Sequence, residues 1–354
     1  MTPKPLLTRI ILAASAVSAP LWAQTPLFTD GTAFGGSKVF SEGLNPLGNS
    51  ARFKTAPNGY YFTFVDGDQR AQNNKSILDN TSSTDPAAAS GALGQLANAP
   101  WALRTRAYGL AATKDGANLS LTREEFNGLV AFPDLAHLGA GLSGNTSTLD
   151  GRRAIVDRLS VGGGGPVQQG STTAMGANLR MERWALGQTT SSFGSGGFLP
   201  APSDLMGGTG TTDRAWNLAL DAGLVLEVAQ GVRVAVTADQ LNPKRLWDVD
   251  LRPQFRAGLQ LDLGQMAKLT LESDINAAER MPFPVKQQTA AASVRFALSP
   301  AAVLMVGVEQ KKIAGTAVTR GGATLQIRTD SLMLGFGFQA GQDRPMKSMT
   351  LMVN

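Results

Sequence analysis

Cysteine is absent from the 354 residues, and histidine occurs only once. The chain therefore has no disulfide, cysteine-ligated zinc site, iron–sulfur cluster or thiol nucleophile, and a metal site built from several histidines is excluded. Charged residues make up 17% of the chain, whereas about 25% is usual in soluble domains. The net charge of +5 is not concentrated in a run of lysine or arginine, so we expect no nucleic-acid partner. We also expect no metal and no cofactor.

Long apolar runs are missing too. The apolar stretch at residues 10–17 (IILAASAV) has only eight residues, whereas a membrane-spanning helix needs about 20. It follows Lys4 and Arg9 and precedes the small residue Ala23, which is the pattern of a cleaved export signal. The sequence therefore predicts a signal peptide over residues 1–23. A mature exported chain without cysteine fits a bacterial envelope.

Glycine (40) and proline (18) are plentiful, which favours many turns and short helices. From residue 215 onward, apolar and polar residues alternate in eight segments, and no charged residue falls on the apolar parity of these segments. Strand side chains point to opposite faces in turn, so each alternating segment predicts a strand with one apolar face. The eight segments lie at 216–228, 232–239, 254–263, 268–275, 290–298, 304–309, 323–330 and 332–339.

The connections between these segments alternate in length. Tight connections at 229–231, 264–267, 299–302 and 330–331 alternate with longer ones at 240–252, 277–287, 312–321 and 341–347. Outer-membrane barrels have short periplasmic turns and long outer loops. We therefore predict an all-β fold, an antiparallel transmembrane β-barrel of about 12–14 strands, whose last strand contains Met349, Leu351 and Val353. The scarcity of aromatics (6%) and the terminal Asn354 leave a soluble periplasmic β-rich protein as the alternative.

The amino-terminal half alternates less regularly. We expect a strand at 58–65, a short helix at 85–98, a hairpin of 104–113 with 117–123, and a strand at 173–186. Arg183 and Trp184 break the parity of that last strand, which predicts a bulge there. The glycine-rich stretches 162–165 and 191–212 predict flexible loops. The domains would be the signal peptide, an amino-terminal segment at 24–56 and a barrel at 57–354.

Two sets of short motifs resemble known barrel families. The stretches 31–39 (GTAFGGSKV) and 44–51 (LNPLGNSA) resemble the amino-terminal region of FadL-like barrels, although Leu47 stands where that family prefers alanine. The stretches 241–243 (LNP), 252–258 (RPQFRAG) and 271–276 (LESDIN) resemble TraF-like conjugal-transfer barrels. These resemblances imply a barrel whose amino-terminal segment lies in the lumen as a plug, with a turn at Gly35, Gly36, Asn45 and Pro46. An ordinary exported tail remains the alternative for this segment.

Charges on the polar parity are the candidate site residues. If the apolar face meets lipid, these charges face the lumen, where they need partners or water. Their mixed signs predict cross-strand ion pairs that hold the barrel together, bind a plug or line a narrow pore. They are Arg233, Asp239, Arg256, Asp262, Lys268, Glu272, Asp274, Arg295, Glu309 and Arg328.

Signs of catalysis are weak. Residues 31–38 (GTAFGGSK) lack the Gly-Lys-Ser/Thr end of a phosphate loop, and no serine–aspartate pair is evident for His137. We therefore predict no enzyme. The favoured role is passage of a small or hydrophobic solute, or anchoring of an envelope (conjugal-transfer) assembly, with outer-membrane lipid, a solute or other envelope proteins as partners. A non-conducting structural or secretion accessory is the alternative.

Overall fold

The computed structural model describes residues 38–40, 49–51, 57–69, 85, 87–88, 91–92, 103–132, 134, 136–137, 146–192, 212–281, 283–313, 316–340 and 346–353. The predicted signal peptide and the predicted plug turn at Gly35, Gly36, Asn45 and Pro46 lie outside these residues. Among the residues described, no helix has the length and apolar character needed to cross a membrane.

The described residues are almost entirely in strands, which makes the fold all-β as predicted. The strands are β1 (Gly59–Gln69), β2 (Leu103–Lys114), β3 (Ala117–Phe132), β4 (Thr148–Pro166), β5 (Thr173–Ser192), β6 (Thr212–Ala229), β7 (Val232–Asp239), β8 (Lys244–Leu246), β9 (Val249–Leu251), β10 (Gln254–Asp262), β11 (Ala267–Asp274), β12 (Ala278–Arg280), β13 (Phe283–Ser299), β14 (Ala302–Ile313), β15 (Thr316–Arg328), β16 (Leu332–Gln339) and β17 (Met346–Val353). In the region where a short helix was expected, residues 87–88 and 91–92 are helical.

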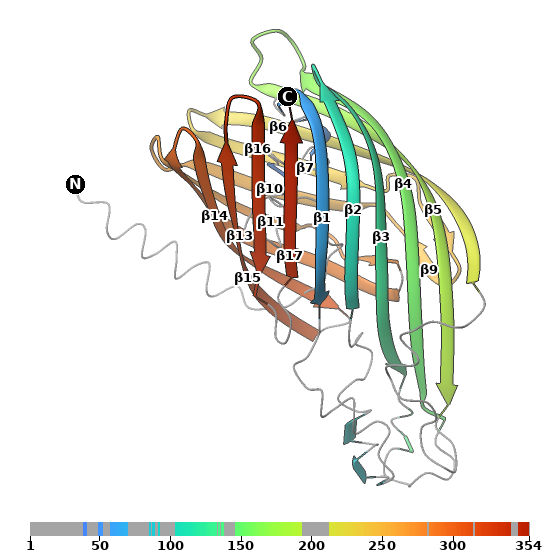
Figure 1. The fold of residues 1–354 in the computed structure, drawn as a ribbon. Helices are drawn as coiled ribbons and strands as arrows, with labels where there is room; N and C mark the ends of the chain where they lie inside the picture. Colours follow the sequence, from blue (N-terminus) through green and yellow to red (C-terminus); the bar gives the residue numbers. More distant parts are fainter. Residues whose placement is uncertain are drawn as a thin grey trace.

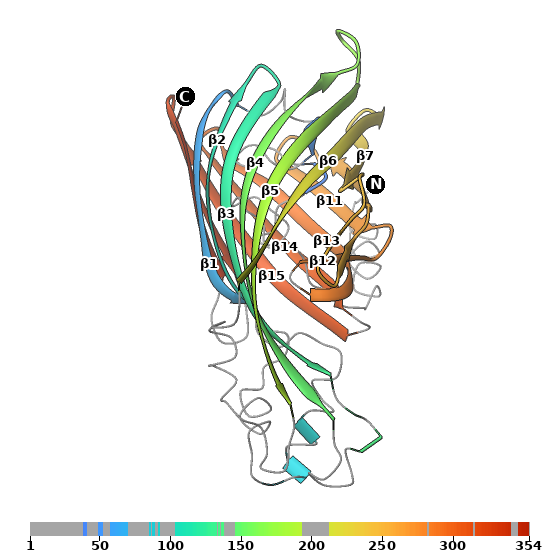
Figure 2. The same cartoon turned by 90° about the vertical axis from the view of Figure 1, so that its right-hand side faces the viewer.

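Fourteen of these strands form one closed antiparallel barrel (Figures 1 and 2). The pairing of β1 with β17 joins distant parts of the chain and closes the barrel, and β11 pairs with β13 across the short strand β12. The strands β8 and β9 form a separate hairpin, and β12 pairs only with β13. The prediction of an even-stranded transmembrane barrel is confirmed.

The two ends of the barrel differ. At one end, called here the turn end, the strands are joined by the short segments 115–116, 167–172, 230–231, 263–266, 300–301 and 329–331. At the other end, called the loop end, lie the longer described segments 240–253 and 275–281. The strands β3, β4 and β5 extend further toward the loop end than their neighbours do (Figures 1 and 2).

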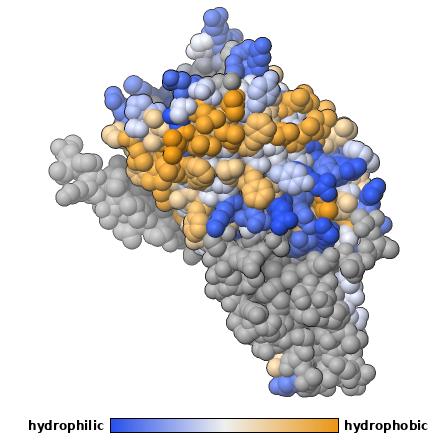
Figure 3. Space-filling model, viewed as in Figure 1, coloured by the Kyte–Doolittle hydropathy of each residue, from blue (hydrophilic) through white to orange (hydrophobic). Residues whose placement is uncertain are grey.

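An apolar belt crosses the outer face of the barrel that Figure 3 shows. In all eight alternating segments of the carboxyl half, the apolar parity faces outward, as the exposed Leu218, Val306 and Phe336 illustrate. The opposite parity faces inward and is largely buried and polar, as at Thr270 and Gln326. A soluble sandwich buries its apolar face, so this inverted arrangement is that of a barrel in lipid.

Three sequence predictions were wrong. No register shift interrupts β5 at Arg183 and Trp184, because Arg183 points outward beyond the belt while Trp184 points inward and is buried. The glycines 162–165 belong to β4 and pair with residues 175–178 of β5. The expected loop at 312–321 is mostly paired strand, since β-branched residues there continue the ladder between β14 and β15.

Candidate functional site: the barrel interior

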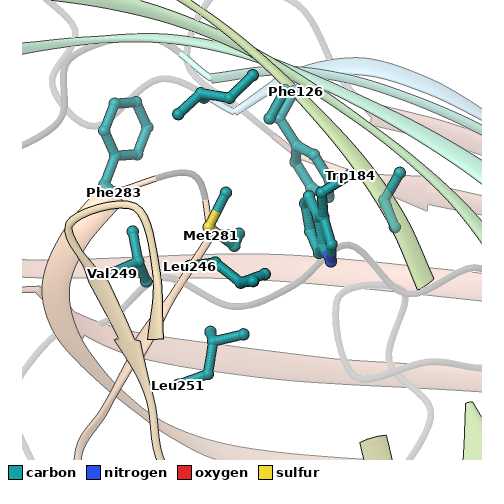
Figure 4. Close-up of a cluster of buried hydrophobic side chains, with 10 residues drawn as sticks. Phe126, Trp184, Leu246, Val249, Leu251, Met281 and Phe283 are labelled. Atoms are coloured by element: carbon teal, nitrogen blue, oxygen red, sulfur yellow. The ribbon is translucent and has the colours of Figure 1, made fainter. Parts of the chain in front are cut away.

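Near the loop end, the interior holds an apolar cluster (Figure 4). Its members come from the inward faces of β3, β4 and β5, from the β8–β9 hairpin, and from the segment around β12 and β13. Phe126 and Trp184 stack with their ring centroids 6.4 Å apart. The buried members are Phe126, Ala154, Val156, Trp184, Leu186, Leu246, Val249, Leu251, Met281 and Phe283. The cluster lies inside the wall and its buried members are at most 6% exposed, so it is an apolar core separate from the outer belt.

Arg152 holds the hairpin against the wall. Its guanidinium donates to both carboxylate oxygens of Asp248, at 2.9 and 2.6 Å, and to Asp150 at 2.9 Å. It also lies over the ring of Phe283, 6.0 Å from the centroid. Bidentate arginine–carboxylate pairs fix orientation as well as distance, so the hairpin is fastened over the apolar cluster in one position.

A layer of buried ion pairs follows toward the turn end on the β3–β6 side. Arg158 bridges two carboxylates, because it donates to Glu124 and, at 2.8 Å, to Glu182. Glu182 also accepts bonds from the Trp184 indole at 3.0 Å and from Asn217 at 2.9 Å. The side chains of the three charged residues are at most 7% exposed. The indole bond links this layer directly to the apolar cluster.

A second group of charges lies on the opposite wall, on β10 and β11. Arg256 donates to Asp274 at 2.6 Å and to Glu272 at 3.2 Å. Gln254 donates to Asp274 at 2.9 Å and accepts a bond from Arg280 at 3.0 Å. Buried charges are tolerated only when paired and hydrogen-bonded, and here each carboxylate has more than one donor.

The ten predicted site residues occupy inward-parity positions. Arg233 donates to Asp262 at 3.2 Å near the turn end, and Lys268 lies opposite Arg295 in the ladder. Arg328 is exposed at the end of β15. The others, which lie deeper, are Asp239, Arg256, Glu272, Asp274 and Glu309. Whether these charges bind a plug or line a pore stays a prediction.

Several interior charges were missed at the sequence level. They lie on β3–β6, β12, β14 and β15: Glu124, Arg158, Arg180, Glu182, Asp221, Arg280, Lys311 and Arg320. The spacing of Arg180 and Glu182 on alternate positions of β5 is the signal that could have found two of them.

The described part of the amino-terminal segment lies against the second group of charges and against Asp239 on β7. Lys38 pairs with Asp239 through its ammonium group, and its backbone N–H donates to Glu272 at 3.2 Å. The backbone N–H of Val39 donates to the same carboxylate at 3.1 Å, and Asn49 donates to the Val39 carbonyl at 2.8 Å. The segment is thus bonded to β7 and β11 of the barrel wall.

A row of glycines makes room for this segment. Gly164, Gly176 and Gly223 lie side by side in the ladder of β4, β5 and β6. A Cβ atom at the first two would collide with the Ser50 carbonyl, and one at Gly223 would collide with the Asn49 side chain. On the opposite wall, a Cβ at Gly258 would lie 2.9 Å from the Phe40 ring. We call these four residues the glycine seat.

His137, the one candidate base, lies in the loop between β3 and β4. Its Nδ1 is 2.8 Å from Asp134, and the hydrogen bond to His137, followed by bonds from Thr146, lowers the pKa of Asp134 to about 2. Because the pKa is lowered in the folded state, these bonds stabilise the folded loop at pH values above 3.8, the ordinary pKa of the carboxyl group. This stabilisation is lost as the pH falls through about 2. We expect the Thr146 amide resonance to shift only in that acidic range, and a midpoint near 4 would contradict the bonding.

In the described part of the chain, no group of three or more His, Asp or Glu side chains is arranged to hold a metal ion.

Solved structures with the same architecture identify the fold. The chain aligns with the toluene transporter TbuX of Ralstonia pickettii with a TM-score of 0.54 at 10% identity, covering 94% of this chain and 97% of that one. For the toluene transporter TodX of Pseudomonas putida the values are 0.53, 11%, 95% and 98%. For a FadL homologue of Pseudomonas aeruginosa they are 0.51, 9%, 95% and 99%.

The fold is that of the FadL-type barrels. These identities are low, so the likeness concerns architecture. No family model matches the sequence, and no curated protein matches it. The TraF-like part of the sequence resemblance is not supported by these FadL-type structures.

Proposed function

We propose that the protein is an outer-membrane channel that passes a hydrophobic solute through its barrel, and that it is not an enzyme. The observation that carries this proposal is the apolar cluster inside the loop end, beneath the β8–β9 hairpin. Water-filled porins have polar interiors, whereas an internal apolar surface offers a binding place to a molecule that water dissolves poorly. The FadL-type fold, which two toluene transporters share, supports the same role.

In the proposed orientation, the loop end faces outward and the turn end faces the periplasm. A solute would contact the apolar cluster first and then meet the buried ion pairs and the segment around Lys38. The segment at 24–56 would act as a plug, held by its bonds to Asp239 and Glu272 and accommodated by the glycine seat. Passage would therefore require this segment to move.

Transport is tested by toluene uptake into vesicles that contain the purified full-length chain, with arabinose as a polar comparison. Saturable toluene uptake supports the proposal. Its absence, together with no conductance before or after deletion of residues 25–55, would favour a non-conducting accessory role.

Heat-dependent migration on a gel tests the membrane barrel itself, and a chain that stays folded and monomeric without detergent would contradict it.

Val249→Asp tests whether the apolar cluster binds the solute. Val249 is fully buried in the cluster, but it belongs to the hairpin, which is not part of the barrel ladder. An unpaired carboxylate there would make the surface polar, so we expect toluene uptake to fall about tenfold while the barrel still folds. Lys244→Asp places the same side chain on an exposed site of the same hairpin and serves as control. Equal uptake by wild type and Val249→Asp would refute the assignment.

A further inference from the structure

Charged side chains gather on the outer face, along the loop-end edge of the apolar belt. The ladder aligns Tyr108, Arg123, Asp157, Arg183 and Trp216 in one row across β2–β6. The next row toward the turn end is wholly apolar and consists of Leu110, Leu121, Leu159, Met181 and Leu218. The change from apolar to charged thus occurs within one row, and a hydrophilic region borders the belt in Figure 3.

The row beyond it, toward the loop end, continues the charges onto β1 and β17. We call the charged residues of the two rows the edge cluster: Asp66, Arg106, Arg123, Glu125, Asp157, Arg183, Arg214 and Lys347. It contains five cationic side chains and three carboxylates, so it has an excess of positive charge.

The ion pairs within the edge cluster leave their arginines open to an outside partner. Asp157 pairs with Arg123 at 3.3 Å and with Arg183 at 2.6 Å, yet these arginine side chains are 43% and 50% exposed. Arg106, paired with Asp66 at 3.4 Å, is 47% exposed. Exposed pairs contribute little to stability, so folding alone gives little reason for an arginine-rich surface on the outward side of a membrane barrel.

Aromatic side chains indicate the depth of this edge in the membrane. Tyr108 and Trp216, which lie at the two ends of the charged row, are 48% and 58% exposed on the outer face. Such rings favour the level of the lipid headgroups. The arginines beside them therefore lie where a headgroup phosphate would lie, and a guanidinium binds phosphate through two parallel hydrogen bonds.

We propose that the edge cluster binds the phosphorylated disaccharide headgroup of lipid A, the lipid anchor of the outer leaflet of a bacterial outer membrane. This inference rests on the proposed outer-membrane location, with the loop end outward. Arg123 and Arg183 contact the phosphates, which compete with Asp157 for the two guanidinium groups. The apolar row beneath them packs against the acyl chains.

Binding is tested by native mass spectrometry of the full-length chain in detergent, titrated with Kdo2-lipid A. We expect Arg123→Gln/Arg183→Gln to weaken retention about tenfold, because two charge-assisted contacts are lost. Lys286→Gln/Lys312→Gln removes the same charge from exposed sites on β13 and β14 and is expected to change retention little. Asp157→Asn, which frees both arginines, is expected to strengthen retention.

Comparison ligands separate lipid A from other sources of phosphate. Phosphatidylglycerol and inorganic phosphate are expected to bind weakly and to respond equally to both double variants. Equal lipid A retention by wild type and Arg123→Gln/Arg183→Gln, equal losses in both double variants, or weaker retention by Asp157→Asn would each overturn the proposal. Toluene uptake does not enter this measurement, so a barrel that fails to transport toluene but retains lipid A through these arginines would contradict only the proposed function.

Discussion

Gly176→Val is expected to open the barrel to ions. A Cβ at this position would collide with the Ser50 carbonyl oxygen and would lie 2.7 Å from the Ala51 nitrogen. Ladders on both sides hold β5 in place, so the amino-terminal segment is the part that must give way. Overpacking costs about 1–3 kcal/mol, and a shift of that size changes a two-state equilibrium about 5- to 150-fold. Conductance in planar bilayers should rise accordingly.

Gly163→Val is the matched control for this experiment. Gly163 lies on the neighbouring strand, and its Cβ would meet only the Gly116 carbonyl, at 3.7 Å. We expect wild-type conductance from this variant. A Gly176→Val protein that loses heat-dependent migration without gaining conductance would show that the strand moves instead of the segment, and this would contradict the plug assignment.

Arg158→Met is expected to destabilise the barrel more than any exposed charge substitution. It would leave Glu124 and Glu182 buried on either side of β4 without the cation that they share. Removing one partner of a buried ion pair costs about 3–5 kcal/mol. Urea unfolding in phospholipid vesicles, followed by tryptophan fluorescence, measures this loss.

Two comparisons isolate the cause. Arg183→Met removes an arginine that is 50% exposed from a pair with Asp157 and should cost at most about 1 kcal/mol. The triple variant Glu124→Gln/Arg158→Met/Glu182→Gln removes the charges together and should recover much of the stability, because no carboxylate is left unpaired. Equal costs for Arg158→Met and Arg183→Met would mean that the interior is well hydrated and the buried pairs are weak.

The carboxyl half of the fold could be predicted because one physical rule governs it. Segments such as 254–263 meet lipid on one side and the lumen on the other, so charged residues fall only on the polar parity. Gly231 and Gly264 mark two of the tight turns, because the backbone there has a positive φ angle, which glycine adopts readily. Together these features predicted the antiparallel order of the strands, the parity that faces outward and the end of the barrel at which the short turns lie.

The amino half could be predicted only in part, because the rule reverses there. The expected strands at 58–65, 104–113, 117–123 and 173–186 are present, but β4 was not predicted. In the outer parts of β4 and β5, Val156 and Trp184 point into the lumen while Asp157 and Arg183 point outward. An apolar cluster within the wall and a charged surface outside it look like broken parity in the sequence. Gly164 resembled loop residues because nothing in the sequence reveals that a distant backbone packs against it.

The interior site could be predicted only in part for the same reason. Parity alone placed Arg256, Glu272 and Asp274 on one face, but their bonds to one another depend on the register between β10 and β11. The hairpin that covers the apolar cluster lies within a segment predicted as a loop, and its fastening by Arg152 joins residues 96 positions apart. Contacts at such separations do not leave a local pattern.

The pairing of β1 with β17 has a consequence for biogenesis. Among the described strands, the one that completes the circle is the last to be translated, so the barrel cannot seal before β17 is made. Until then, β1 and β16 would each present a row of unsatisfied amide groups, which invites aggregation during export. We therefore expect the cell to need an escort for this polypeptide across the periplasm, and a premature stop codon before residue 346 to yield a product that proteases remove.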